Sequence, residues 1–124
     1  MMAKQVYEAW KTISIGTKYI SIDAIIDDWE GFRIIMNSSD QKIRVAFPGK
    51  LSYLVRDESD LHGDALRSSG LGNGSFYIVH HSDYKARFIS DSISSYENVN
   101  HYAIVTDGDC VDVLTCQDPI WTVL

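Results

Sequence analysis

The residues best suited to acid–base chemistry are four histidines, His62, His80, His81 and His101. Two histidines with a carboxylate can transfer protons in the way that phosphodiester hydrolysis requires. His80 and His81 end one apolar run and His101 begins another, so two strand ends could meet there. Adjacent residues of a regular strand point to opposite faces, however, so His80 and His81 cannot both line one site. Metal-ligand spacing such as HExxH is also absent, and we therefore expect strand-end or surface histidines, with no catalytic and no metal site.

A glycine-rich loop, Gly70-Leu-Gly-Asn-Gly74, is a second candidate for chemistry. A loop that cradles phosphate needs a helix directly after it, because the backbone amides of the helix N-terminus bind the anion. This loop instead precedes Phe76–Val79, an apolar run with the length of a strand. We therefore expect a simple connection, with no nucleotide and no other cofactor.

Two clusters of carboxylates are candidates for binding. The first holds Asp23, Asp27, Asp28 and Glu30, with Trp29 among them, and the second holds Asp57, Glu58, Asp60 and Asp64. Clustered carboxylates can bind divalent cations, but the spacing of an EF-hand is absent. They can also pair with lysine and arginine on a partner, and an exposed tryptophan among them would suit an interface hot spot. The alternative is a solvated helix start and a hairpin loop whose tryptophan folds back on the core.

Charge is distributed unevenly along the chain. The net charge is −6, and residues 88–124 hold no lysine or arginine. Their six carboxylates are Asp91, Glu97, Asp107, Asp109, Asp112 and Asp118. A negative surface at one end of the molecule would favour basic partners through long-range steering, and it argues against nucleic acid, which needs a cationic face. The alternative is that the charge only keeps the protein soluble.

Alternating apolar residues predict four strands in the first half of the chain. The inward-facing sets are Ile20, Ile22, Ala24 and Ile26, then Phe32, Ile34 and Met36, then Ile43, Val45 and Phe47, and finally Leu51, Tyr53 and Val55. The short loops between them are typical of an antiparallel meander, and Pro48-Gly49 suits the centre of a type II turn. Residues 5–14 predict a short helix or an irregular arm.

In the second half, helices are predicted over residues 59–67 and from Asp83 to about Asp91, with Ser82 as the N-cap of the latter. Residues 101–115 predict a hairpin, because Asp107-Gly108 has the residue types of a two-residue type I′ turn. The elements together predict an α+β fold in a single domain, residues 1–124. Its main part would be an antiparallel sheet of six or seven strands, with an N-terminal meander, a C-terminal hairpin and two or three short helices.

The two cysteines, Cys110 and Cys116, are six residues apart. On one strand their Cα atoms would be about 20 Å apart, and a disulfide needs less than about 7 Å. We therefore expect two free, buried or half-buried thiols in a reducing cytoplasm. The N-terminus shows no apolar signal-peptide core, and no apolar run approaches the roughly 18 residues of a membrane span.

The second half also resembles a group of small uncharacterised bacterial proteins. The matching segments are Arg56-Asp-Glu-Ser-Asp60, Phe76-Tyr-Ile-Val-His-His-Ser-Asp-Tyr84, His101-Tyr-Ala-Ile-Val-Thr106, Asp112-Val-Leu114 and Pro119. Proteins of this group look like the immunity partners of polymorphic and contact-dependent growth-inhibition toxins. The resemblance covers about residues 50–120, and its motifs are structural. Because immunity families diverge at the toxin-facing surface, it assigns no binding residue.

The resemblance implies a cytoplasmic bacterial immunity protein with no enzymatic activity. It would bind the C-terminal domain of a cognate toxin, and a nuclease with a basic cleft would suit the acidic charge. Blocking would be steric and electrostatic. One alternative is a small cytoplasmic enzyme or ligand-binding domain that uses His101 and nearby carboxylates, and another is an oligomeric adaptor.

Overall fold

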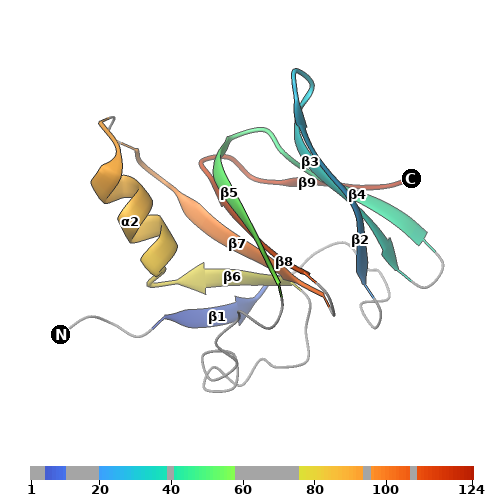
Figure 1. Cartoon of the computed structure of the whole chain (residues 1–124), viewed down its shortest axis with the longest axis horizontal. Helices are drawn as coiled ribbons and strands as arrows, with labels where there is room; N and C mark the ends of the chain where they lie inside the picture. The colour runs from blue at the N-terminus through green and yellow to red at the C-terminus, as the bar shows by residue number, and fades with distance from the viewer. Residues whose placement is uncertain (1–4, 11–19, 39–40, 58–75, 94–95, 107–108) are drawn as a thin grey trace.

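The computed structural model describes residues 5–10, 20–38, 41–57, 76–93, 96–106 and 109–124. These residues form nine strands and one helix (Figure 1). The strands are β1 (Val6–Ala9), β2 (Ser21–Asp28), β3 (Gly31–Ser38), β4 (Gln41–Phe47), β5 (Lys50–Asp57), β6 (Phe76–His80), β7 (Asn100–Val105), β8 (Asp109–Thr115) and β9 (Ile120–Val123). The helix is α2 (Asp83–Asp91).

The strands form two sheets in which all the pairings are antiparallel. Sheet A has five strands in the order β1-β6-β7-β8-β5, and sheet B has four in the order β2-β3-β4-β9. In Figure 1, sheet B crosses over one end of sheet A, and α2 lies near the opposite end of sheet A.

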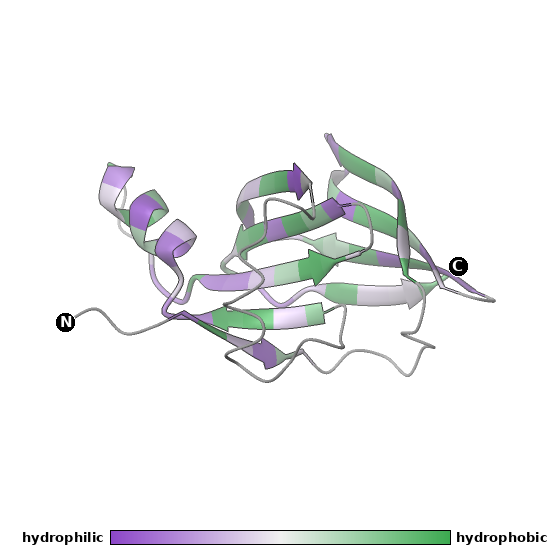
Figure 2. Cartoon of the chain, turned by 60° about the horizontal axis from the view of Figure 1, so that its bottom comes forward, coloured by the Kyte–Doolittle hydropathy of each residue, from purple (hydrophilic) through white to green (hydrophobic). Residues whose placement is uncertain are grey.

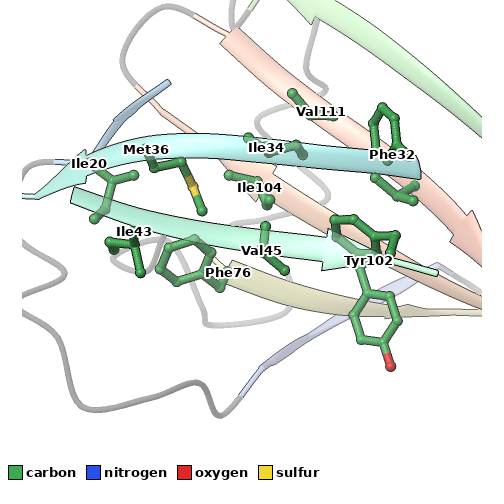
Figure 3. Close-up of a cluster of buried hydrophobic side chains, with 12 residues drawn as sticks. Ile20, Phe32, Ile34, Met36, Ile43, Val45, Phe76, Tyr102, Ile104 and Val111 are labelled. Atoms are coloured by element: carbon green, nitrogen blue, oxygen red, sulfur yellow. The ribbon is translucent and has the colours of Figure 1, made fainter. Parts of the chain in front are cut away.

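The main hydrophobic core lies between the two sheets (Figure 3). From sheet B it takes the inward faces of β3 and β4, on which Ile34 and Val45 are fully buried. From sheet A it takes alternate residues of β7 and β8, including Ile104 and Val111. Apolar burial on this scale is the main stabilising contribution, because each large side chain removed from water contributes about 1.5–3 kcal/mol.

The prediction of an α+β fold is wrong, because the described part of the chain is nearly all β. Strands form at both ends of the chain, where the sequence pattern did not predict them. Residues 6–9 form β1 in place of a helix or arm, because Tyr7 packs edge-on against Tyr77 of the neighbouring strand, with ring centroids 5.7 Å apart. Residues 120–123 pair with β4 as β9. The predicted helix over residues 59–67 lies outside the described residues.

The predicted four-stranded meander is also wrong at its last strand. β2, β3 and β4 are consecutive neighbours in sheet B, but β5 crosses to sheet A and pairs with β8. Pro48-Gly49 is therefore no hairpin turn, and Gly49 does not have the positive φ of a type II turn. A glycine is required at position 49 for a different reason, because a Cβ there would lie 2.8 Å from the backbone nitrogen of Gln117. The chain crosses between the sheets where only a glycine fits.

A β-bulge changes the predicted inward face of β2. The register with β3 shifts between Ile22 and Ala24, so side chains beyond that point reverse their sides. Ile25 consequently packs against the core, where strict alternation had placed Ala24 and Ile26.

Val55, predicted to face inward, is exposed, but three other local predictions are confirmed. The inward sets of β3 and β4 are buried, α2 begins after Ser82 as its N-cap, and β7 pairs with β8 as the C-terminal hairpin. Figure 2 shows apolar residues concentrated on the strands and a mostly hydrophilic α2. Among the described residues, no helix has the length and apolar character that a membrane crossing requires.

Candidate functional site

The first candidate site is the turn between β2 and β3, which we call the hairpin tip: Asp27, Asp28, Trp29, Glu30 and Gly31. Gly31 has φ 111°, which suits glycine after a tight turn. Asp28 Oδ1 accepts a hydrogen bond of 2.9 Å from the backbone N–H of Glu30, which closes the turn. Trp29 is 90% exposed, so its indole does not fold back on the core. This outcome favours the binding interpretation of the first acidic cluster over the structural one.

The carboxylates of the hairpin tip are partly neutralised by the protein itself. Arg33 Nη1 donates to Asp28 Oδ1 at 2.8 Å, and Arg33 Nη2 lies 3.7 Å from Glu30 Oε2. The hydrogen bond from Arg33 holds the pKa of Asp28 below its ordinary value. Lys50 Nζ pairs with Asp27 at 3.0 Å. Three carboxylates thus face two cations, so the hairpin tip combines a fixed shape with a net charge of about −1.

The second acidic cluster is largely outside the described residues. Asp57 is the last residue of β5, where its backbone pairs with Asp109. Glu58, Asp60 and Asp64 lie outside the described part. Their predicted role in partner binding stays a prediction.

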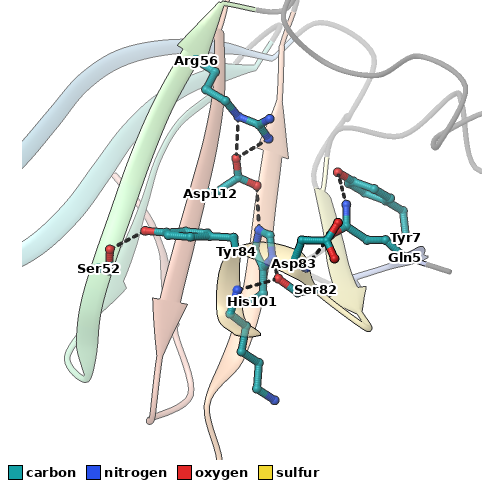
Figure 4. Close-up of polar contacts among 10 residues, drawn as sticks. Gln5, Tyr7, Ser52, Arg56, Ser82, Asp83, Tyr84, His101 and Asp112 are labelled. Carbon is teal, nitrogen blue, oxygen red and sulfur yellow. Dashed lines mark hydrogen bonds and ion pairs between the residues drawn. The ribbon is translucent and has the colours of Figure 1, made fainter. Parts of the chain in front are cut away.

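The second candidate site is a buried polar network on the outer face of sheet A: Ser82, His101, Asp112 and Arg56 (Figure 4). His101 Nε2 lies 2.7 Å from Asp112 Oδ1, and His101 Nδ1 lies 2.6 Å from Ser82 Oγ. Arg56 donates to the other carboxylate oxygen of Asp112 from Nε at 3.1 Å and from Nη2 at 2.6 Å. Both polar ends of His101 and both oxygens of Asp112 are therefore engaged.

The network joins residues from four elements. Arg56 comes from β5, Asp112 from β8 and His101 from β7, while Ser82 is the N-cap of α2. Ser82 Oγ also accepts a hydrogen bond of 3.0 Å from Lys85 N. The helix start is thus hydrogen-bonded to the centre of sheet A.

Burial and charge act in opposite directions on this network. Burial opposes the charge of Arg56, but the neighbouring Asp112 outweighs it, so the pKa of Arg56 is raised. Burial raises the pKa of the nearby Cys110 thiol to about 12. It also raises the pKa of Tyr7, which lies beside the same arginine. Asp112 is 1% exposed, so its charge depends on Arg56 for compensation.

Two pockets adjoin the network. One, of about 420 Å³, lies between α2 and strands β6 and β7, and the other, of about 330 Å³, lies beside Arg56 and Tyr84. His101 lines both of them. Tyr84 OH is hydrogen-bonded to Ser52 Oγ, so the side chain that separates α2 from β5 is held in place.

His101 lies near the start of β7, as expected for a strand-end histidine, but it is buried and takes part in the network. His80 is exposed and lies 3.4 Å from Glu8, and His81 is exposed as well. The hairpin prediction carried a signal for the missed site. A turn at residues 107–108 puts Ala103 opposite Asp112 and His101 opposite Leu114, so His101 and Asp112 are diagonal neighbours on one face.

The described carboxylates of the negative tail do not gather at one end of the molecule. Asp112 is internal, while Asp109, the first residue of β8, and Asp118, beyond its other end, are exposed. Both cysteines are free, as predicted, but only Cys110 is buried and Cys116 is exposed. Within the described ranges, no group of three or more histidine, cysteine, aspartate or glutamate residues could hold a metal ion.

Comparisons of the chain with protein-family models, with curated proteins and with solved structures find no match. The resemblance of its second half to immunity proteins therefore stays a prediction. The hairpin tip and the buried polar network remain the two regions from which function can be inferred.

Proposed function

We propose that this chain is an immunity protein that binds the C-terminal domain of a cognate toxin and blocks it. The observation that carries the proposal is the exposure of Trp29 at an acidic hairpin tip. A tryptophan with nine-tenths of its surface in water contributes little to folding. Tryptophan is also among the residues most enriched at interface hot spots.

The hairpin tip is ordered before any partner arrives. The Asp28 carboxylate is held by the backbone of Glu30 and by the side chain of Arg33. A partner therefore loses little free energy to ordering this loop, which favours tight binding. The proposed contact places the indole in a pocket of the partner, with carboxylates at its rim.

The charges of the tip favour a basic partner. Asp27, Asp28 and Glu30 flank Trp29 in the sequence, and a basic cleft such as that of a nuclease would complement them. Because Arg33 and Lys50 already pair with these carboxylates, affinity should depend more on Trp29 than on charge. Charge should instead govern the association rate, which falls as salt screens exposed groups over about 8 Å at physiological ionic strength. Inhibition of this kind needs no chemistry by the chain and would take place in the cytoplasm.

The test uses the full chain and the C-terminal domain of the large protein encoded immediately upstream. We expect a one-to-one complex, and protection of cells that express the toxin domain. Asp27→Lys combined with Glu30→Lys should slow association and weaken protection. Asp23→Lys is the matched control, because Asp23 lies on the same strand in an exposed pair with Lys42 at 3.3 Å. Absence of a complex, or full protection by the double variant, would overturn the proposal.

A further inference from the structure

Ser82 lies on a sharp connection between a strand and a helix. β6 ends at His80, α2 begins at Asp83, and His81 between them has φ 56°, a conformation that non-glycine residues rarely adopt. A strained strand-to-helix turn is how some hydrolases present a nucleophilic serine at the start of a helix. The glycines that usually flank such a serine are absent here, so the sequence pattern alone does not disclose it.

The hydrogen bonds of His101 are directed so that its ring can accept the proton of Ser82 while it donates to Asp112. Asp112 is an acceptor held by Arg56, so the hydrogen of His101 belongs on Nε2, which lies 2.7 Å from Oδ1. Nδ1 is then the acceptor for the hydroxyl of Ser82 at 2.6 Å. Serine, histidine and aspartate stand in the order of a catalytic triad. The two ring nitrogens are exchanged relative to the usual serine protease, but either nitrogen can accept the proton.

The pocket of about 420 Å³ adjoins this serine and would hold a substrate. Its wall combines apolar and polar side chains. The apolar lining includes Ile78, Ala86, Ile89 and Val99, and the polar lining includes Ser82, Lys85, Asn100 and His101. The volume suits a short acyl chain, and polar groups in the wall can orient a bound ester.

We propose that Ser82 is a nucleophile for the hydrolysis of small carboxylic esters, with His101 as its general base. Ser82 Oγ would bond to the carbonyl carbon while its proton moves to His101 Nδ1. The ester C–O bond then breaks, and the alcohol leaves with that proton. Water, activated by His101, hydrolyses the acyl-serine and releases the carboxylic acid. Asp112 and Arg56 are positioning residues that fix the histidine.

The start of α2 offers electrostatic help to this reaction. Its amides point toward Ser82, as the bond from Lys85 N shows, and a helix N-terminus stabilises developing negative charge. Asp83 N–H donates to Gln5 Oε1 at 3.0 Å and could serve an oxyanion instead. This activity goes beyond toxin binding and does not depend on it, because α2 and the hairpin tip lie apart in Figure 1.

The test treats the purified full chain with a fluorophosphonate and maps the adduct by mass spectrometry. We expect an adduct on Ser82 that forms at least about 100-fold faster than any on Ser90, an exposed serine of the same helix. An absent Ser82 adduct, or one that forms no faster than the Ser90 adduct, would overturn the proposal. This comparison uses the unaltered protein, so it does not depend on whether a variant folds.

Variants then separate catalysis from structure. His101→Gln should abolish labelling and the hydrolysis of p-nitrophenyl butyrate. Asp112→Asn should lower kcat by at least about 100-fold and leave KM unchanged, a split that simple loosening of the pocket would not give. If folded His101→Gln retained the labelling rate, His101 would not be the base and the proposal would fail.

Discussion

The hairpin tip and the buried polar network are built from the same chemical pair in different surroundings. At the tip, Arg33 holds Asp28 at 2.8 Å, and in the network Arg56 holds Asp112 at 2.6 Å. The aspartate side chain is 41% exposed at the tip and 1% exposed in the network. An exposed pair contributes about 0–1 kcal/mol, whereas breaking a buried one costs about 3–5 kcal/mol. Similar geometry therefore supports the fold in one region and leaves the other free for recognition.

The largest effect is expected at Asp112. Asp112→Ala leaves Arg56 and His101 without their acceptor in a buried site. We expect the free energy of unfolding to fall by about 3 kcal/mol, measured by urea denaturation. Asp109→Ala is the control on the same strand, because Asp109 is exposed, and should change stability by less than about 0.5 kcal/mol. Equal effects of the two substitutions would remove the contrast between buried and exposed charge.

A smaller loss is expected when the helix end of the network is cut. Ser82→Ala removes both the N-cap bond to Lys85 N and the bond to His101 Nδ1. The expected cost is about 1–2 kcal/mol, again by urea denaturation. Ser90→Ala, on the exposed face of α2, should have little effect. A neutral Ser82→Ala would show that α2 does not depend on this attachment.

The two thiols report the difference between surroundings without changing the fold. Cys116 is exposed and should react promptly with a thiol reagent at pH 8, whereas Cys110 should react only after unfolding. Its folded pKa is raised from 9.0 to about 12, so the folded state favours the neutral thiol. The stabilising contribution of the neutral Cys110 thiol is fully present below its unfolded pKa of 9.0, and it is lost as the pH rises from about 9 toward 12. Prompt reaction of both thiols in the native protein would contradict burial of the network side of sheet A.

The smallest effect is expected in the free energy of unfolding at low pH. The folded pKa of Asp28 is lowered from 3.8 by Arg33, so its contribution is present above that pH and is lost as the pH falls through the folded value. Since the carboxylate is open to solvent, Asp28→Asn should change the pH dependence of unfolding only slightly. Urea denaturation of both proteins between pH 2 and pH 6 measures the difference, and a large change would contradict the exposure of the Asp28 side chain.

Local signals in the sequence predicted the local parts of the fold. The Ser82 cap predicted α2, and the Asp107-Gly108 pair predicted the pairing of β7 with β8. The assignment of strands to sheets could not be predicted in this way. It depends on β5 crossing to β8 and on β9 pairing with β4, and these contacts join segments far apart in the chain. The bulge in β2 also escapes a strict period-two pattern.

The sequence identified the hairpin tip but could not decide whether Trp29 faces solvent, because an aromatic residue in a loop is compatible with both outcomes. It missed the polar network for a different reason. The sequence offers His101 with nearby carboxylates only as an alternative and does not single out Asp112, although the predicted hairpin register makes the two residues neighbours. Arg56 and Ser82 join them only through the tertiary structure, so their roles had no local signal.

The central claim is that the hairpin tip recognises a partner and is dispensable for folding. The most direct measurement is the affinity of Trp29→Ala for the toxin domain, together with its urea denaturation. We predict a Kd at least about 30-fold weaker, as the loss of a hot spot of about 2 kcal/mol requires, with a free energy of unfolding unchanged within about 0.5 kcal/mol. Ile120→Ala, at an exposed apolar residue of β9, should leave the Kd unchanged. A Trp29→Ala variant that binds as tightly as the unaltered protein would contradict the claim.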